Sequence, residues 1–313
     1  MKITMREAKD VCLSSNFVLR ELCYHELADI HDWYNIPDEA GIASLKLMCE
    51  NILQPVHDHF DRPVRILKGY TCPSLNKALG DAPNSAHCSC QAVDIRVSNL
   101  SPFTVANWIA ENLDYDTLII EYSDYSVGNM VNPWLHVSFN AGNNRRLNLT
   151  CEQGLRALKL APNFTLWEMV RSATATAKKI FNLPDEAGIE RLRLVAVNIL
   201  QPVRNFFGRS VRVNSGYRSP ALNAAVGSKA SKTSQHMKCE AADFEIMGVD
   251  NFVLAQWIAK NLEYDQLILE FYGNDKSDPN DGWVHCSYTI RRQNRKQDLT
   301  INKKGTRPGL IKD

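Results

Sequence analysis

The sequence lacks the features that would place the chain in a membrane or on nucleic acid. No run approaches 18 uncharged apolar residues, so no transmembrane helix is expected. Neither sign of charge dominates, because 36 Lys and Arg stand against 35 Asp and Glu, for a net charge of +1. A strongly basic surface drives non-specific binding to nucleic acids and anionic lipids, so neither kind of partner is expected here.

The first residues also lack the apolar segment of a secretion signal. The nine cysteines are odd in number, and their spacing does not suggest a small disulfide-bonded scaffold. We therefore expect mostly reduced thiols in a cytoplasmic protein. The oligomeric state stays open.

The chain contains one long internal repeat. Pro37–Ile42 recurs letter for letter as Pro184–Ile189, and Asn51–Val56 recurs as Asn198–Val203, each 147 residues later. Units of solenoid proteins run to about 20–50 residues, so a repeat of this length indicates two complete domains. We expect the first domain over residues 1–150, a linker over 151–162 and the second domain over 163–313.

The pattern within each copy predicts an α+β domain whose antiparallel sheet is flanked by helices. In the second copy, apolar residues recur at helical spacing over 189–207 and 252–261. Pro202 is expected to kink or end the first of these helices. Apolar and β-branched runs predict strands over 211–213, 241–246, 266–271 and 283–288.

Two histidines and one aspartate recur at matched places in the two copies, whereas the other four histidines have no counterpart. The aspartate follows the first histidine by seven residues, and the second histidine comes 42 residues after the aspartate. Zinc accepts imidazole nitrogen and carboxylate oxygen, and catalytic zinc sites keep three protein ligands and an open position. We therefore expect one Zn²⁺ per copy, with the ligands His87, Asp94 and His136 in the first and His236, Asp243 and His285 in the second.

A cysteine also recurs three residues after the first histidine of each set. Cys90 and Cys239 each have two possible roles. A thiolate would complete a closed site with four ligands, as in structural zinc sites. A thiol packed as a small apolar residue would instead leave the metal position open.

The second copy reads Ser-Gly-Tyr-Arg-Ser-Pro over 215–220, then Ser-Gln-His over 234–236, Asp243, and Trp-Val-His over 283–285. Over nearly its whole length this copy resembles the zinc D-alanyl-D-alanine carboxypeptidases of bacteria and phages, which share their fold with the hedgehog signalling domain. The resemblance implies two tandem domains of this fold. It also implies a zinc peptidase that cuts peptidoglycan stems, as a D,D-carboxypeptidase or as an endolysin-like endopeptidase.

The same resemblance implies how the substrate is held. Arg218 would face the developing oxyanion or the terminal carboxylate of a peptidoglycan peptide, because its planar fork suits such oxygens. The neighbouring polar residues of the motifs are expected to bind substrate, namely Ser219, Ser234 and Gln235. A phage-encoded protein of this kind would be released to the cell wall by other factors or carried in the virion.

A carboxylate must also take a proton from the attacking water. Some relatives place an acid three residues before the last histidine, where this chain has Gly282. The candidates are therefore Glu270 and Asp281, and Glu270 is favoured because Glu121 matches it in the first copy. A further departure is Cys239, which stands where the family has a glycine.

The first copy departs more from the family, because Thr71 replaces the arginine and Ala86 replaces the glutamine. We expect this copy to bind zinc but to be a poor or inactive peptidase that binds wall peptide or stabilises the second copy. Two other functions stay open for the whole chain. One is a zinc-stabilised wall-binding or structural module without catalysis, and the other is a zinc peptidase that acts on a different peptide.

Overall fold

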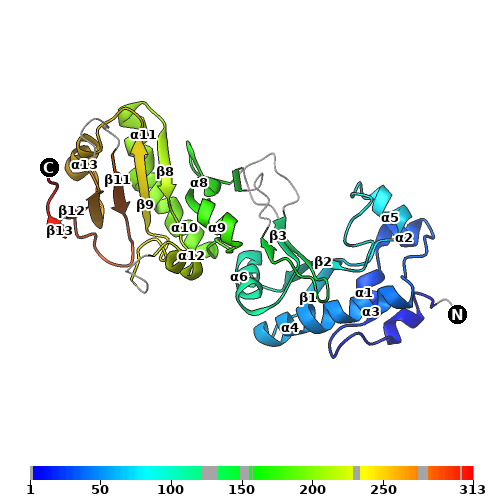
Figure 1. Ribbon diagram of the computed structural model, residues 1–313. Helices are drawn as coiled ribbons and strands as arrows, with labels where there is room; N and C mark the ends of the chain where they lie inside the picture. Colours follow the sequence, from blue (N-terminus) through cyan, green and yellow to red (C-terminus); the bar gives the residue numbers. More distant parts are fainter. Residues whose placement is uncertain are drawn as a thin grey trace. The chain divides into compact units, whose positions relative to one another are not determined.

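The computed structural model describes residues 3–121, 133–148, 155–156, 158–227, 233–273, 281–303 and 305–312. Contacts divide these residues into two compact units, the first ending at residue 148 and the second beginning at residue 155. Each unit is an α+β domain in which helices flank a mainly antiparallel sheet (Figure 1), as the sequence predicts. In the part of the chain described, no helix has the length and apolar character needed to cross a bilayer.

The first unit begins with helical segments and continues with alternating strands and helices. Its helical elements are η1 (Glu7–Asp10), α1 (Leu19–Cys23), α2 (Glu26–Ile30), α3 (Glu39–Met48), η2 (Cys49–Leu53), α4 (Gln54–Phe60), α5 (Pro73–Ala78) and α6 (Pro102–Asn112). Its strands are β1 (Val64–Lys68), β2 (Ala92–Val97), β3 (Thr117–Glu121), β4 (Trp134–Ser138) and β5 (Leu147–Asn148). The sheet order is β1-β2-β4-β3-β5, and only the β3–β5 pair is parallel.

The second unit repeats this order of elements. Its helical elements are α8 (Leu166–Val170), α9 (Ala173–Lys178), α10 (Glu186–Val195), η3 (Ala196–Leu200), α11 (Gln201–Phe207), α12 (Pro220–Ala225) and α13 (Asn251–Asn261). Its main sheet contains β8 (Val211–Ser215), β9 (Ala241–Ile246), β10 (Gln266–Glu270), β11 (Trp283–Ser287), β12 (Gln297–Asn302) and β13 (Gly305–Pro308). The order is β13-β12-β10-β11-β9-β8, with β10 and β12 parallel.

Part of the linker expected over 151–162 has regular structure. Lys159–Ala161 forms strand β6, which pairs with β7 (Phe164–Thr165) of the second unit. Leu160 and Ala161 are buried there, so apolar packing holds this end of the segment against the unit.

The long helix of the second unit continues past the proline expected to kink or end it. Between α10 and α11 the helix widens into the π-helical turn η3, and Pro202 is the second residue of α11. A proline has no N–H to donate to the carbonyl of the preceding turn, and a wider turn accommodates that loss. The apolar residues that recur at helical spacing in its first half are all buried, namely Ile189, Leu192, Val195, Ala196 and Ile199.

Candidate metal centre

The central strands of each sheet place an aspartate and a histidine directly opposite each other. Asp243 of β9 pairs with His285 of β11, and Asp94 of β2 pairs with His136 of β4. Directly opposed residues of an antiparallel pair project to the same face of the sheet. The register therefore brings a carboxylate and an imidazole together in each unit, as the strand pattern predicts.

The first histidine of each set comes from the turn that precedes the middle strand. In the second unit, His236 Nδ1 donates to the carbonyl oxygen of Gly216 at 2.6 Å. A side chain at Gly216 would place its Cβ only 2.4 Å from the carbonyl oxygen of Met169, so only glycine fits this close approach. The resulting backbone contact fixes the imidazole ring and turns Nε2 toward Asp243.

Three donor atoms converge in the second unit. Asp243 Oδ1 lies 3.2 Å from His236 Nε2 and 2.8 Å from His285 Nδ1, and these two nitrogens are 3.2 Å apart. Zinc ligands at about 2.0–2.2 Å from a tetrahedral ion would be about 3.3–3.6 Å apart, slightly wider than this set. The three residues are each only 5% exposed. This group has the size and chemistry to hold a metal ion.

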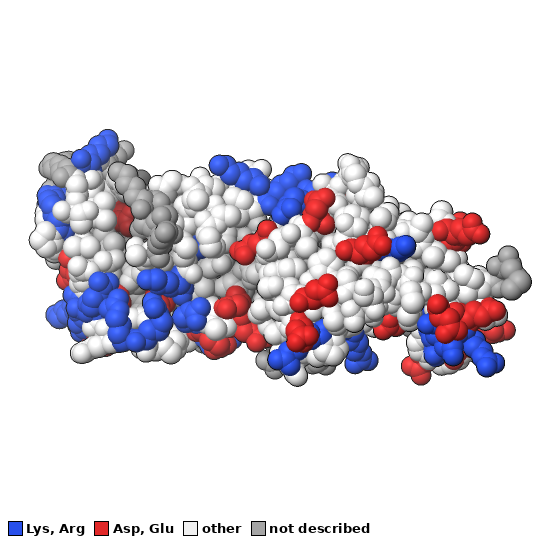
Figure 2. All heavy atoms as spheres, turned by 90° about the horizontal axis from the view of Figure 1, so that it is seen from below, with Lys and Arg blue, Asp and Glu red and all other residues white. Residues whose placement is uncertain are grey.

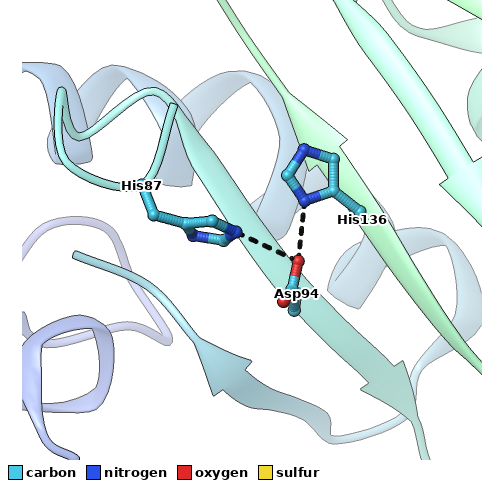
Figure 3. A group of neighbouring side chains, drawn as sticks. All are labelled: His87, Asp94 and His136. Carbon is cyan, nitrogen blue, oxygen red and sulfur yellow. Dashed lines mark hydrogen bonds and ion pairs between the residues drawn. The ribbon is translucent and has the colours of Figure 1, made fainter. Parts of the chain in front are cut away.

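The first unit has the same arrangement (Figure 3). Asp94 Oδ1 lies 3.3 Å from His87 Nε2 and 2.8 Å from His136 Nδ1. His87 Nδ1 donates to the carbonyl oxygen of Gly69 at 2.8 Å, whereas its buried Nε2 has only the long approach to Asp94 Oδ1. A buried polar atom without a well-formed hydrogen bond is costly, and a metal ion would satisfy it. This second group is therefore also suited to hold a metal ion.

Electrostatics keep both aspartates ionised. Burial raises the pKa of Asp243, but His236 and His285 outweigh this effect, and the net pKa lies far below its usual range. Asp94 shows the same balance in the first unit. A carboxylate held in its charged form is a ready ligand for a cation.

A second carboxylate stands near the donor atoms of the second unit without belonging to them. Glu270 ends β10 and lines the same hollow, of about 810 Å³, as His236, Asp243 and His285. Burial and the charge of Asp243 raise the pKa of Glu270 to about 6, although His285 and Arg218 lower it. A carboxyl group with such a pKa exchanges protons near neutral pH, which suits a general base.

A cation lies on the far side of Asp243 from the histidines. Arg218 Nη2 donates to Asp243 Oδ2 at 2.6 Å, and its Nε donates to Ser215 Oγ at 2.7 Å. The side chain is 20% exposed and lines the hollow. The arrangement thus combines three candidate metal ligands, a proton-exchanging carboxyl group and a cation around one cavity.

A family model described as peptidase M15 matches residues 20–127 and 162–287, one segment in each unit. The two segments together cover most of the chain. The chain belongs to the peptidase M15 family. This membership makes it a metallopeptidase of a zinc-dependent family. No curated protein matches the chain.

The backbone at Gly282 leaves no room for an acidic side chain three residues before the last histidine. Its φ is +73°, and an added Cβ would lie 2.0 Å from the carbonyl oxygen of Glu270. An aspartate or glutamate would therefore clash with the backbone. Asp281 is not among the described residues that line the hollow, and its carbonyl oxygen faces Asn251 Nδ2 at 3.4 Å. Geometry thus favours Glu270 of the two candidate bases.

Cys239 stands where the resemblance implies glycine, and its backbone conformation suits glycine. Its φ is +60°, in the left-handed region, where a non-glycine residue costs about 1–3 kcal/mol. The thiol is buried and points to α10, within 2.8 Å of where a Cβ of Gly188 would lie. Burial raises its pKa to about 12, so it stays protonated.

The equivalent Cys90 has a φ of +59° and a pKa raised by burial to about 12. Neither thiol belongs to the groups of described residues that are suited to hold a metal ion. Of the two roles considered for these cysteines, the structure favours packing. It also accounts for the glycine in the repeated Pro-Asp-Glu-Ala-Gly-Ile segment, which makes room for the sulfur.

The three polar residues expected to bind substrate have different positions. Ser234 lines the hollow. Ser219 is the N-cap of α12, is 6% exposed and accepts a hydrogen bond from the N–H of Leu222. Short polar side chains at helix N-termini take this role readily, so Ser219 has a role in folding, and its contact with substrate stays a prediction.

Gln235 also lines the hollow, and its amide has partners within the protein. Its Oε1 lies 3.1 Å from His285 Nε2, and its Nε2 donates to Asp265 Oδ2 at 2.8 Å. Both ends of the amide are thus engaged within the protein. The contact fixes the imidazole of His285 with Nδ1 facing Asp243, a device that orients metal-ligating histidines.

Replacing Gln235 by Ala is expected to weaken zinc binding at this centre by about 10- to 100-fold, because His285 loses the group that orients it. The measurement is a chelator competition in a chain that carries His87→Ala, so that only the second centre titrates. Ser234→Ala, which removes a neighbouring polar group, is the control. An unchanged affinity in Gln235→Ala would show that the amide does not support the centre.

Basic side chains surround the hollow of the second unit. Figure 2 shows Lys and Arg gathered on one face of this unit, and three of the residues that line the hollow are Arg291, Arg292 and Arg295. Arg291 pairs with Glu240, and the other two pair with the fully buried Asp265. The buried acids hold the guanidinium groups in place. In the sequence the only sign of this rim is a run of basic residues after the last predicted strand.

Proposed function

We propose that the second unit is a zinc peptidase that hydrolyses peptide bonds in peptidoglycan stems. One observation carries this proposal. Glu270 lies beside the three candidate ligands but outside their set, which leaves a carboxyl group for proton transfer. A closed structural zinc site has four protein ligands, whereas here three candidate ligands face a hollow that Glu270 also lines.

His236, Asp243 and His285 would hold the zinc ion. When bound, zinc supplies a Lewis acid and lowers the pKa of a water ligand to about 7. Glu270 accepts the proton of the attacking water and returns it to the leaving amine. Arg218 offers N–H groups to the oxygen on which negative charge develops, or to a terminal carboxylate.

The basic rim supports a substrate with carboxylate groups. Arg291 and Arg292 reach the hollow from the loop after β11 and remain about half exposed, at 52% and 46%. A peptidoglycan stem carries a terminal carboxylate. Fixed guanidinium groups attract such a peptide and discriminate against basic ones.

Digestion of purified peptidoglycan by the whole zinc-loaded chain, followed by mass spectrometry of the muropeptides, tests the proposal. We expect either loss of a terminal D-alanine, which defines a D,D-carboxypeptidase, or cleavage of cross-links, which defines an endopeptidase. EDTA is expected to abolish either product. Unchanged muropeptides from folded, zinc-loaded protein would contradict the proposal and favour a zinc-stabilised binding module or another peptide substrate.

A further inference from the structure

Both units place a cation at the same oxygen of the candidate metal-binding aspartate. In the second unit, Arg218 Nη2 donates to Asp243 Oδ2 at 2.6 Å. In the first unit, Lys68 Nζ lies 3.3 Å from Asp94 Oδ2. The other oxygen, Oδ1, faces the two histidines in both units. The ammonium group of Lys68 therefore stands in the place of the guanidinium group.

The two cations come from different positions in the repeat. Lys68 ends β1 and pairs with Asp94, and the residue in the same register of β8 is Ser215, which pairs with Asp243. Both pairs follow the same irregularity in the strand. The first unit thus has a lysine where the second has a serine.

Three residues later the order is reversed. There the first unit has the hydroxyl residue Thr71, and the second unit has the cation Arg218. The backbone is the same at both, because each N–H faces the carbonyl oxygen of the first histidine at 3.4 Å. Thr71 is fully buried, and its hydroxyl group turns to Asn76 at 3.4 Å. The two units therefore hold one cation and one hydroxyl group in exchanged positions.

Lys68 forms ion pairs with two carboxylates and is partly exposed to solvent. Its Nζ also lies 3.2 Å from Asp81 Oδ2, and its side chain is 21% exposed, against 20% for Arg218. Glu121 ends β3 opposite Trp134, as Glu270 ends β10 opposite Trp283. The first unit thus keeps counterparts of the three candidate ligands, of Glu270 and of the cation at the aspartate.

We propose that Lys68 acts in the first unit as Arg218 acts in the second, so that the first unit is a second peptidase centre. This inference rests on the proposed function of the second unit. It replaces the expectation that the loss of arginine at position 71 makes the first copy poor or inactive. A lysine ammonium is a compact charge that stabilises a single oxygen, whereas the arginine fork also binds carboxylates in a bidentate way.

The test uses the full chain with His236→Ala, in which only the first centre keeps all three ligands. We expect this chain to hydrolyse peptidoglycan stems. Adding Lys68→Ser is expected to lower that rate about 100-fold, the loss typical of one oxyanion donor. Adding Thr71→Arg to the Lys68→Ser variant is expected to restore most of the rate, because the pair then matches the second unit. Serine is tolerated at the equivalent position there, so Lys68→Ser is expected to fold.

Two readouts separate a role toward substrate from a structural one. Zinc content is expected to stay unchanged in Lys68→Ser, because the ammonium faces the oxygen that points away from the histidines. Binding of a synthetic stem peptide to the EDTA-treated chain, measured by calorimetry, is expected to weaken. Equal hydrolysis and binding with and without Lys68 would overturn the inference.

The reciprocal variant keeps this inference separate from the proposed function. A chain with His87→Ala keeps only the second centre complete. If that chain hydrolyses stems and the His236→Ala chain does not, the first unit is no peptidase and only the inference fails. If neither chain hydrolyses stems, the proposed function itself is wrong.

Discussion

A chain that carries both His87→Ala and His236→Ala is expected to bind zinc at neither centre and to leave peptidoglycan intact. Each imidazole supplies Nε2 to its group, at 3.3 Å from Asp94 Oδ1 in the first unit and 3.2 Å from Asp243 Oδ1 in the second. Two remaining ligands hold zinc poorly, and without the metal no water is activated at neutral pH. Zinc per chain, measured by atomic absorption after dialysis, is expected to fall from about two to about one in each single variant and to zero in the double one.

His57→Ala is the matched control, because His57 has no counterpart in the second copy and belongs to neither group. It should leave both the zinc content and the hydrolysis unchanged. Thermal unfolding of all variants in EDTA distinguishes the loss of a ligand from the loss of the fold. Two zinc ions per chain in the folded double variant would show that the ion is bound elsewhere.

The candidate ligands were predictable because a duplication marks them and because strands have a simple period. Asp243 and His285 lie on runs that the sequence identifies as strands, and β9 has the predicted bounds. Two residues that bind the same ion from neighbouring antiparallel strands must lie nearly opposite each other, and this requirement fixes the register of β9 and β11. His236 lies in a turn, which has no such period, so only the duplication and its spacing to Asp243 marked it.

Strands β12 and β13 were not predicted, because they lack the alternation that signals a strand. Of β12 only Thr300 is fully buried, and β13 contains no buried residue. The last strands of a sheet expose polar side chains, so their sequences resemble loops. They nevertheless extend the sheet beside β10, the strand that carries Glu270.

Lys68 shows a different limit of sequence comparison. Matching the copies position by position pairs Lys68 with Ser215 and Thr71 with Arg218. In each pair one copy has a basic residue and the other has a neutral one, so each pair suggests that a cation is missing. Only the coordinates show that a side chain starting three residues earlier reaches the same carboxylate oxygen. The contact of Gln235 was likewise not predictable. The motif shows where Gln235 stands in the chain, but it does not show that the amide contacts His285.

Glu270→Gln, in a chain that carries His87→Ala, is expected to lower kcat/KM for stem hydrolysis by about 10²–10⁴-fold, the usual contribution of a general base. The amide has nearly the same shape, so zinc content and peptide binding are expected to stay unchanged. Asp281→Asn is the matched control, since Asp281 is outside the described lining of the hollow, and it should retain most of the activity. If Asp281→Asn were the inactive variant instead, the assignment of the base would be wrong.

The pH dependence of the same reaction gives a second test of Glu270. Burial and the charge of Asp243 raise its pKa to about 6, and the base acts only when ionised. Hydrolysis is therefore expected to fall as the pH drops through the pKa of Glu270. The positive charge of bound zinc opposes the effect of burial, so this acid limb is expected at or below about pH 6. In Glu270→Gln the limb should disappear from the residual rate, whereas a limb that persists in this variant would assign it to another group.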